Sequence, residues 1–220
     1  MHGEQRPIYA QISYLTPNNR LFGKKIIVTG GSRGLGFSMA QKFVSEGADV
    51  LITGRDEMSL KRSAQQLHCK YLVLDAQDLE SFKSFYTTAE QLLGGFNCLV
   101  NNAGVSLHEQ DFFHVTKESF DKQINTNLRS SVFMAQGFIQ ELLETKQKGN
   151  LLFISSEVGD LADNRPYGWT KASINSFVRG LASNFAKNDI RINAIAPGVT
   201  CSSMTGFDSH GNLHIPTNAT

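Results

Sequence analysis

The sequence contains few of the residues that mark secreted scaffolds or metal-binding proteins. Its 220 residues include only three cysteines, Cys69, Cys98 and Cys201, which form neither an even set nor a CxxC pair. This count argues against a disulfide framework and against a zinc site. Six histidines are present without metal-ligand spacing: His2, His68, His108, His114, His210 and His214. We therefore expect reduced cysteines and no metal.

Long apolar runs and an excess of one charge are also absent. No run approaches the roughly 18 apolar residues that cross a bilayer, and the N-terminal region lacks the apolar core of a signal peptide. The net charge of +1 gives no electrostatic reason to expect nucleic acid or an anionic membrane as a partner. These absences favour a cytoplasmic protein that acts on small molecules.

The rest of the composition is that of one globular domain, with 40% hydrophobic and 19% charged residues. From residue 25 onward, short apolar β-branched runs alternate with longer segments of helical period. Six strands are predicted, at 26–28, 50–52, 71–74, 98–100, 151–154 and 192–195. Because these runs lack apolar/polar alternation, helices are expected on both faces of the sheet. The pattern predicts a doubly wound parallel α/β fold.

A glycine-rich turn follows the first predicted strand and precedes a helical pattern. It reads Thr29-Gly30-Gly31-Ser32-Arg33-Gly34-Leu35-Gly36. Glycines permit a tight turn and close backbone approach, while free N–H groups at a helix N-terminus bind pyrophosphate. The place of the turn at the start of a βαβ unit favours nucleotide binding over the alternative, a tight turn without a ligand.

A second candidate site is the pair Tyr167 and Lys171, four residues apart in a predicted helix spanning 165–187. This spacing puts both side chains on one helical face, and a nearby ammonium favours the phenolate. The pair is therefore a candidate acid/base centre. The alternative is that Tyr167 simply begins the core-facing stripe of the helix.

Taken together, these motifs resemble the short-chain dehydrogenase/reductase family over residues 25 to 204. The glycine spacing Gly30-x3-Gly34-x-Gly36, the later Asn101-Asn102-Ala103-Gly104, Ser156, Tyr167-x3-Lys171 and Pro197-Gly198 occur in the family's order. The resemblance implies a Rossmann-like single domain and hydride transfer between a nicotinamide and a secondary alcohol or ketone. It also implies that no metal is needed.

The same resemblance implies four catalytic roles. Tyr167 would be the general acid or base, and Lys171 would lower its pKa and hold the nicotinamide ribose. Ser156 would hydrogen-bond the substrate oxygen, and Asn127 would hold a water that links Lys171 to solvent. The family pattern favours Ser156 and Asn127 over two neighbours of the same residue type, Ser155 and Asn125.

Cofactor choice follows from charge at the end of the second strand. An acidic residue there would bind the ribose of NAD and repel the extra phosphate of NADP. The chain has Thr53-Gly54-Arg55 instead, and Arg33 lies in the glycine-rich turn. Two guanidinium groups can clamp a 2'-phosphate, so NADP(H) is predicted over NAD(H), although either arginine can also be a solvated surface charge.

Further cofactor contacts are expected by resemblance. They comprise the adenine contact Asp75-Ala76, the loop Asn102-Ala103-Gly104, the turn Pro197-Gly198, and Ser202 with Thr200 as its rival. In the glycine-rich turn, the predicted contacts are Gly30, Ser32, Arg33, Gly34, Leu35 and Gly36.

The predicted organisation has three segments. Residues 1–22 form an N-terminal arm, 23–205 the Rossmann-like NADP-binding catalytic domain, and 206–220 a loop or incomplete substrate lid. After Met204 the family's lid, last helix and last strand have no counterpart before Thr220, so we expect a truncated polypeptide with an open pocket. Family members often assemble through two long helices, here 118–146 and 165–187, which implies a homodimer or homotetramer.

Two other functions stay open from the sequence. One is a catalytically silent NADP-binding regulator or scaffold, and the other is epimerase or dehydratase chemistry on the same fold. Phe112, Phe113 and Trp169 are candidates for an apolar substrate pocket, although aromatic residues lie more often in the core. The sequence does not identify the substrate.

Overall fold

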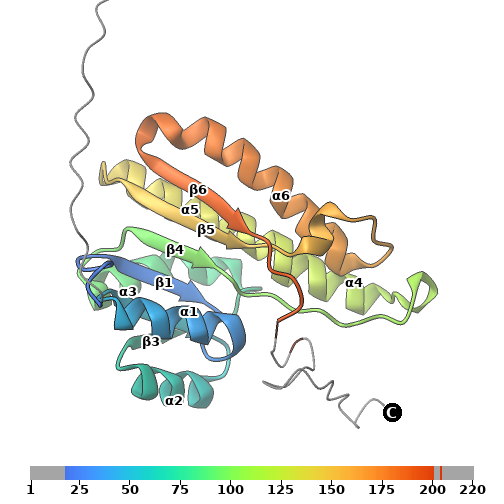
Figure 1. Cartoon of the computed structure of the whole chain (residues 1–220), viewed down its shortest axis with the longest axis horizontal. Helices are drawn as coiled ribbons and strands as arrows, with labels where there is room; N and C mark the ends of the chain where they lie inside the picture. The colour runs from blue at the N-terminus through green and yellow to red at the C-terminus, as the bar shows by residue number, and fades with distance from the viewer. Residues whose placement is uncertain (1–17, 201–203, 205–220) are drawn as a thin grey trace, which may run out of the picture.

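A parallel sheet of six strands runs through the part of the chain that the computed structural model describes, residues 18–200 and 204 (Figure 1). The strand order is β3-β2-β1-β4-β5-β6. The strands are β1 Lys25–Thr29, β2 Asp49–Gly54, β3 Lys70–Val73, β4 Cys98–Asn101, β5 Gly149–Ile154 and β6 Ile190–Ile195. All six predicted strands and the doubly wound fold class are confirmed.

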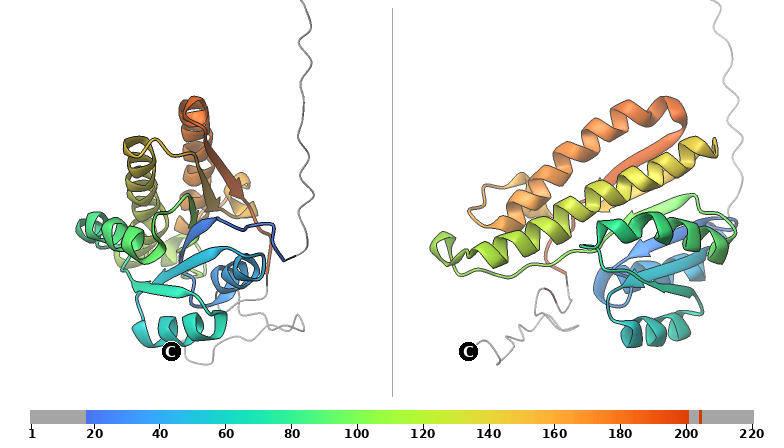
Figure 2. Two further views of the ribbon diagram at one scale, coloured as in Figure 1. Left: turned by 90° about the vertical axis from the view of Figure 1, so that its left-hand side faces the viewer. Right: turned by 180° about the vertical axis from the view of Figure 1, so that it is seen from behind.

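Helices cover both faces of the sheet, because alternate strand residues point to opposite sides and both sets are apolar. On one face, Ile26, Val28 and Ile52 pack against α1 Gly34–Ser45 and α2 Glu57–Leu67. On the other, Ile27 and Leu51 lie in the core formed with α3 Phe82–Leu93, α5 Ser130–Glu144 and α6 Pro166–Phe185. The right-hand view of Figure 2 shows the last three helices side by side.

The helix predicted at 118–146 is continuous but not uniform. It starts as α4 Lys117–Gln123, widens into a π-helical segment at Ile124–Arg129, and continues as α5. Such π-helical turns interrupt α-helices most often at functional sites. The segment matters here because it carries Asn127, which is 1% exposed.

The helix predicted at 165–187 is observed as α6, followed by a 3-10 turn at Ala186–Asn188. Pro166 occupies its first turn, where the missing N–H costs no helical hydrogen bond. This start fixes Tyr167 in the first turn of the helix, close to the carboxyl ends of the strands.

Residues 18–22 of the predicted N-terminal arm run beside the end of α1. The Leu21 N–H donates a hydrogen bond of 2.8 Å to Glu46 O, and Arg20 Nε lies 3.6 Å from the Glu46 carboxylate. The assignment of 1–22 as an arm stays a prediction, and positions 1–17 lie outside the described residues.

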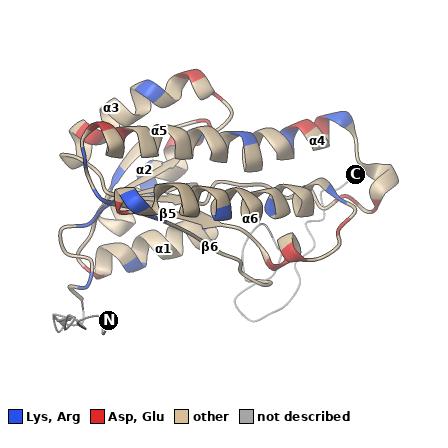
Figure 3. Cartoon of the chain, turned by 90° about the horizontal axis from the view of Figure 1, so that it is seen from above, with Lys and Arg blue, Asp and Glu red and all other residues tan. Residues whose placement is uncertain are grey.

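Basic and acidic residues are interspersed along α4, whereas the charged residues of α5 are acidic, Glu141 and Glu144 (Figure 3). No helix among the described residues is long and apolar enough to cross a membrane.

Candidate active site

A cleft of about 1080 Å³ opens at the carboxyl ends of the strands. The strand order reverses between β1 and β4, so the loops that leave these two strands diverge to opposite faces and leave a crevice. The cleft is lined by the turn after β1, the loops after β2, β3, β4 and β5, the start of α6, and the segment after β6. Motifs that are far apart in the sequence thus surround one cavity.

The glycine-rich turn forms one wall of the cleft and is built for a close backbone approach. Gly30 and Gly34 have positive φ angles of 65° and 55°. A Cβ atom on Gly36 would lie 2.2 Å from the Gly30 carbonyl oxygen, so no side chain fits there. Only glycine allows the first turn of α1 to pack so closely on the strand.

The start of α1 fits a phosphate group. Its N-cap residue, Arg33, makes no side-chain capping hydrogen bond, and no acidic residue lies in the first turn. The backbone N–H groups and the positive end of the helix dipole are therefore available to an anion. This observation supports a dinucleotide whose pyrophosphate is held at Gly34–Gly36.

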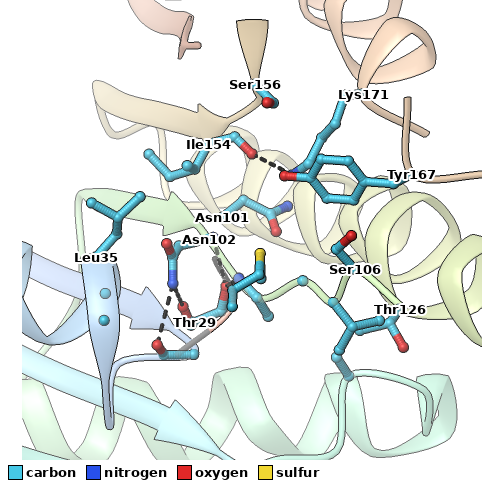
Figure 4. Close-up of a pocket in the computed structure, with 18 of the residues that line it drawn as sticks. Thr29, Leu35, Asn101, Asn102, Ser106, Thr126, Ile154, Ser156, Tyr167 and Lys171 are labelled. Atoms are coloured by element: carbon cyan, nitrogen blue, oxygen red, sulfur yellow. Dashed lines mark hydrogen bonds between the residues drawn. The ribbon is translucent and has the colours of Figure 1, made fainter. Parts of the chain in front are cut away.

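Hydrogen bonds from the loop after β4 hold the glycine-rich turn in position (Figure 4). The Asn102 amide donates to Thr29 O at 2.8 Å and to Gly30 O at 3.2 Å. The Thr29 hydroxyl oxygen accepts the backbone N–H groups of Asn102 and Ala103, both at 2.9 Å. Asn102 is therefore tied to the turn itself. The role of Thr29 escaped the sequence reasoning, which quoted the residue but assigned it no contact.

Tyr167, Ser156 and Lys171 converge at the other end of the cleft, above Asn101 and Asn102 in Figure 4. The Ser156 side chain lies close enough to the Tyr167 phenol to lower its pKa. Lys171 Nζ lies 5.5 Å from the centre of the Tyr167 ring and donates a hydrogen bond of 2.8 Å to Ile154 O. Since Ser156 follows β5 and the other two residues begin α6, the β5–α6 connection builds the group.

Burial is the largest influence on the pKa values of this pair. Burial raises the pKa of the Tyr167 phenol, and the Ser156 side chain only partly opposes it. Burial also lowers the pKa of Lys171 from its usual 10.5 to about 8. Lys171 does not contribute to this shift, so its expected lowering of the Tyr167 pKa stays a prediction. A neutral phenol is suited to donate a proton.

Ser155 and Ser156 have different surroundings. The Ser155 hydroxyl is buried and donates to Asn175 Oδ1 at 2.5 Å, within the packing of β5 against α6. Successive residues of an extended chain point to opposite sides, so Ser156 faces the cleft. The structure thus places Ser156, and not Ser155, beside Tyr167.

Asn127 lies next to Lys171 across Gly104. Its Oδ1 accepts the Val105 N–H at 2.8 Å, and its Nδ2 donates to Val105 O at 2.8 Å. A Cβ atom on Gly104 would lie 3.3 Å from Asn127 Oδ1 and 3.8 Å from Lys171 Nζ. The asparagine side chain is therefore engaged in holding the loop after β4 against the π-helical segment.

Arg33 and Arg55 lie on the same wall, at the turn after β1 and just after β2. Both side chains are exposed, both line the cleft, and neither takes part in an ion pair with a described residue. The nearby Asp56 is engaged elsewhere, since its carboxylate accepts the Ser59 N–H at 2.6 Å and caps α2. Gly54, the last residue of β2, stands where an acidic side chain would repel a phosphate, and it has no side chain.

The remaining predicted contacts are distributed along the cleft. Asp75, Ala76, Pro197 and Gly198 line it, as do Ser32 and Leu35. Ser202 lies outside the described residues.

A link that sequence reasoning missed joins the loop after β3 to the π-helical segment. Gln77, two residues after Asp75, donates through Nε2 to Thr126 Oγ1 at 3.1 Å. Thr126 directly precedes Asn127, and 49 residues of chain separate it from Gln77. No local sequence pattern predicts such a contact.

The aromatic residues proposed for an apolar pocket are not in the cleft wall. Phe113 is 90% exposed, and its ring contacts that of Phe112 edge to face. Trp169 packs near Phe120 and donates its indole N–H to Asp163 O at 2.8 Å. The described cleft is lined by none of the three predicted aromatic residues, so this interpretation was wrong.

Comparisons with known proteins find relatives of this chain. A family profile described as short chain dehydrogenase matches residues 24–212. A tropinone reductase homolog of Arabidopsis thaliana is 32% identical over 191 residues, which cover 84% of this chain and 73% of the relative. An L-rhamnose 1-dehydrogenase (NADP(+)) of Thermoplasma acidophilum is 30% identical over 195 residues, covering 84% and 76%. The solved structure of a candidate short-chain alcohol dehydrogenase from Sinorhizobium meliloti matches with a TM-score of 0.78 at 31% identity, covering 86% and 77%.

Proposed function

Because the chain belongs to the short-chain dehydrogenase family, we propose that it is an NADP(H)-dependent oxidoreductase that interconverts a secondary alcohol and a ketone. The observation that carries the proposal is the convergence of Ser156, Tyr167 and Lys171 at one end of a cleft whose other wall fits a dinucleotide. A bound nicotinamide supplies the hydride for reduction and accepts it in oxidation.

The residues of this chain handle the proton. In reduction, the Tyr167 hydroxyl donates its proton to the carbonyl oxygen, and its raised pKa keeps the phenol protonated before that step. The Ser156 hydroxyl donates a hydrogen bond to the same oxygen as negative charge develops there. In oxidation, Tyr167 removes the alcohol proton as a phenolate.

Lys171 and Asn127 support this transfer. Lys171 is 6% exposed, and its ammonium favours the phenolate form once Tyr167 has given up its proton. Asn127 holds the loop at Gly104 beside the Lys171 head group and positions it for a relay to solvent. Asn127, Ser156, Tyr167 and Lys171 are thus the proposed catalytic residues.

The preference for NADP(H) rests on Arg33 and Arg55, two exposed guanidinium groups with no described ion-pair partner on one wall of the cleft. A 2'-phosphate between them would make charge-assisted hydrogen bonds with both. The Thermoplasma relative carries NADP(+) in its name, which supports the same choice. Asp75 and Ala76, which also line the cleft, are proposed to hold the adenine.

Assembly into a homodimer or homotetramer through α4–α5 and α6 is part of the proposal. Phe120, Phe133 and Leu143 on the first two helices are 37%, 42% and 40% exposed, and a partner would cover them. The cytoplasmic location stays a prediction of the sequence.

The deciding experiment measures NADPH oxidation by the full chain across a panel of ketones, beside a fluorescence titration of NADPH binding. We expect tight NADPH binding and turnover of at least one ketone. NADPH binding without turnover of any ketone would favour the catalytically silent regulator instead. Absence of NADPH binding would rule out both the oxidoreductase and the regulator. Product identification by mass spectrometry separates reduction from epimerase or dehydratase chemistry.

A further inference from the structure

The connection between β5 and α6 carries Ser156, whereas Tyr167 lies on the helix itself. Ser156 stands between the end of β5 and the 3-10 turn Glu157–Asp160, and Tyr167 belongs to the first turn of α6. In the proposed reaction both hydroxyls meet one substrate oxygen, and a misplacement of about 1 Å is enough to slow such a step. The connection therefore has to be held at a fixed position against the helix.

On one side, backbone hydrogen bonds hold the connection to the sheet. The Ser155 N–H donates to Ile195 O at 2.8 Å, and the Glu157 N–H donates to Pro197 O at 3.1 Å. Both acceptors belong to β6 or to the segment that follows it. These bonds set the position of Ser156 relative to the sheet, but they do not tie it to α6.

On the other side, one amide of α6 holds the connection at two points. The buried Ser155 hydroxyl donates to Asn175 Oδ1 at 2.5 Å, and Asn175 Nδ2 donates to Asp160 Oδ1 at 3.0 Å. Ser155 directly precedes Ser156, and Asp160 ends the turn that follows Ser156. The Asn175 amide thus bridges the chain before and after Ser156.

The two partners require an amide at this position. An ionised carboxylate only accepts hydrogen bonds, so the NH2 group faces Asp160 and the carbonyl oxygen faces Ser155, whose hydroxyl donates. Aspartate at position 175 would bring a second carboxylate against Asp160, and alanine would make neither bond. The contact therefore depends on having both a donor and an acceptor in one short side chain.

The turn after Ser156 also packs directly on the backbone of α6. A Cβ atom on Gly159 would lie 2.9 Å from Asn175 Nδ2 and 2.9 Å from the Lys171 carbonyl carbon, so only glycine allows this approach. Asn175 follows Lys171 by four residues and Tyr167 by eight, which puts the three side chains on one face of α6. Asn175 therefore holds the turn on the helical face that carries Tyr167 and Lys171.

Neither Asn175 nor Asp160 lines the cleft that the described residues form, so an effect of Asn175 on the reaction has to pass through another residue. We infer that Asn175 is a positioning residue, whose amide holds Ser156 at the place relative to Tyr167 that the proton transfer requires. The inference rests on the proposed oxidoreductase function for its effect on rate. Its own content is the hold of Asn175 on the chain around Ser156.

The first test measures kcat and KM with NADPH and the ketone of the panel that gives the highest kcat/KM. Asn175→Ala should lower kcat by about 10- to 100-fold and change KM for NADPH by less than about twofold, because Ser156 is misplaced and the cofactor site is intact. In a Ser156→Ala background the same change should lower kcat by less than about twofold, since Asn175 acts through Ser156. Asn184→Ala, exposed further along α6, is the matched control and should match the wild type.

A second test exchanges the two partners. Asn175→Asp alone places two carboxylates side by side and should lower kcat at least as far as Asn175→Ala. Asn175→Asp combined with Asp160→Asn reverses the bond, because the amide at position 160 then donates to the carboxylate at position 175, which still accepts the Ser155 hydroxyl. This double variant should return kcat to within about threefold of the wild type.

Amide hydrogen exchange, followed by mass spectrometry, reports the hold of Asn175 without any substrate. Exchange in the peptide that covers residues 155–161 should be faster in Asn175→Ala than in the wild type and should recover in the double variant. If no ketone reacts but exchange follows this order, the oxidoreductase proposal fails and the hold on the chain around Ser156 stands. Wild-type kcat or wild-type exchange in Asn175→Ala, an equal loss of kcat with and without the Ser156 hydroxyl, or no recovery in the double variant overturns the inference.

Discussion

The Lys171 ammonium nitrogen lies 5.5 Å from the centre of the Tyr167 ring and donates a hydrogen bond of 2.8 Å to the Ile154 carbonyl oxygen. The two residues are one helical turn apart, as their spacing predicts, but the lysine is anchored to the end of β5. The proposed catalytic pair is thus joined to the sheet as well as to its own helix. This anchoring keeps the lysine head group buried next to the phenol.

Replacing Tyr167 with Phe removes the proposed proton donor and little volume. We expect kcat to fall by about 100- to 10,000-fold, the usual contribution of general acid–base catalysis, while NADPH binding remains measurable. Steady-state rates and a fluorescence titration check both statements. Tyr71→Phe, on a half-buried residue of β3 outside the cleft, is the matched control and should retain activity. Retained turnover in Tyr167→Phe would reject the assignment.

The buried Lys171 makes stability depend on pH. Its pKa is lowered to about 8 in the folded protein from a usual 10.5, so between these values the unfolded chain binds more protons than the folded one. The free energy of unfolding contributed by Lys171 therefore rises with pH through this window, by up to about 3 kcal/mol. Below pH 8 the Lys171 ammonium is charged in both states. Its burial then lowers the free energy of unfolding by an amount that does not change with pH.

Lys171→Met removes this titration. The free energy of unfolding of the variant minus that of the wild type should be most positive near neutral pH and should fall as pH rises from 8 to 10.5. Urea denaturation of both proteins at a series of pH values measures this difference. The contributions of other groups that titrate in the same range are the same in both proteins and cancel in the subtraction. A difference that does not change with pH would contradict the lowered pKa.

Cofactor preference should depend on Arg55 and Gly54. Arg55→Asp removes one guanidinium and adds repulsion, so the ratio of kcat/KM for NADPH to that for NADH should fall by about 10- to 100-fold. Gly54→Asp should act in the same direction, because a Cβ there meets Leu60 at an ordinary 3.6 Å and the position tolerates a side chain. Arg179→Asp, exposed on α6 and away from the cleft, controls for net charge. An unchanged ratio in both cleft variants would refute the 2'-phosphate clamp.

Two glycine-to-alanine substitutions should have opposite effects. At Gly36 the new Cβ would lie 2.2 Å from Gly30 O and 2.6 Å from Asn102 Nδ2, so we expect destabilisation of at least about 1–3 kcal/mol and loss of NADPH binding. At Gly180, in α6, no atom lies within 4 Å of the new Cβ, and helix propensity should stabilise the protein by about 0.5–1 kcal/mol. Thermal unfolding and an NADPH titration measure both. Normal NADPH binding by Gly36→Ala would rule out the phosphate site at that turn.

Features that depend on neighbouring residues could be predicted from the sequence. The six strands follow from short apolar runs, and the tight turn after β1 follows from glycines between a strand and a helix. The helix predicted at 118–146 was correct in extent, but its π-helical segment at Ile124–Arg129 was not foreseen. Nothing in those six residues distinguishes a wider turn from an ordinary one.

Side-chain direction and long-range pairing were decided by the fold. The aromatic pocket was wrong because Phe113 is 90% exposed in the turn Phe112–His114, and Trp169 packs near Phe120 and donates its indole N–H to Asp163 O. The Glu109–Gln123 contact and the Gln77–Thr126 contact join residues 14 and 49 positions apart, and polar residues in loops carry no periodicity that would reveal them.

The sequence by itself determined the layers, the glycine-rich turn and the spacing of Tyr167 and Lys171, because strand, turn and helix patterns depend on residues close along the chain. Only the tertiary structure decided that Tyr167 has a raised pKa, that Ser156 and not Ser155 lies beside it, and that Gln123 holds the Glu109 carboxylate. These properties depend on which atoms exclude water from a group, and that is fixed only when distant segments pack together.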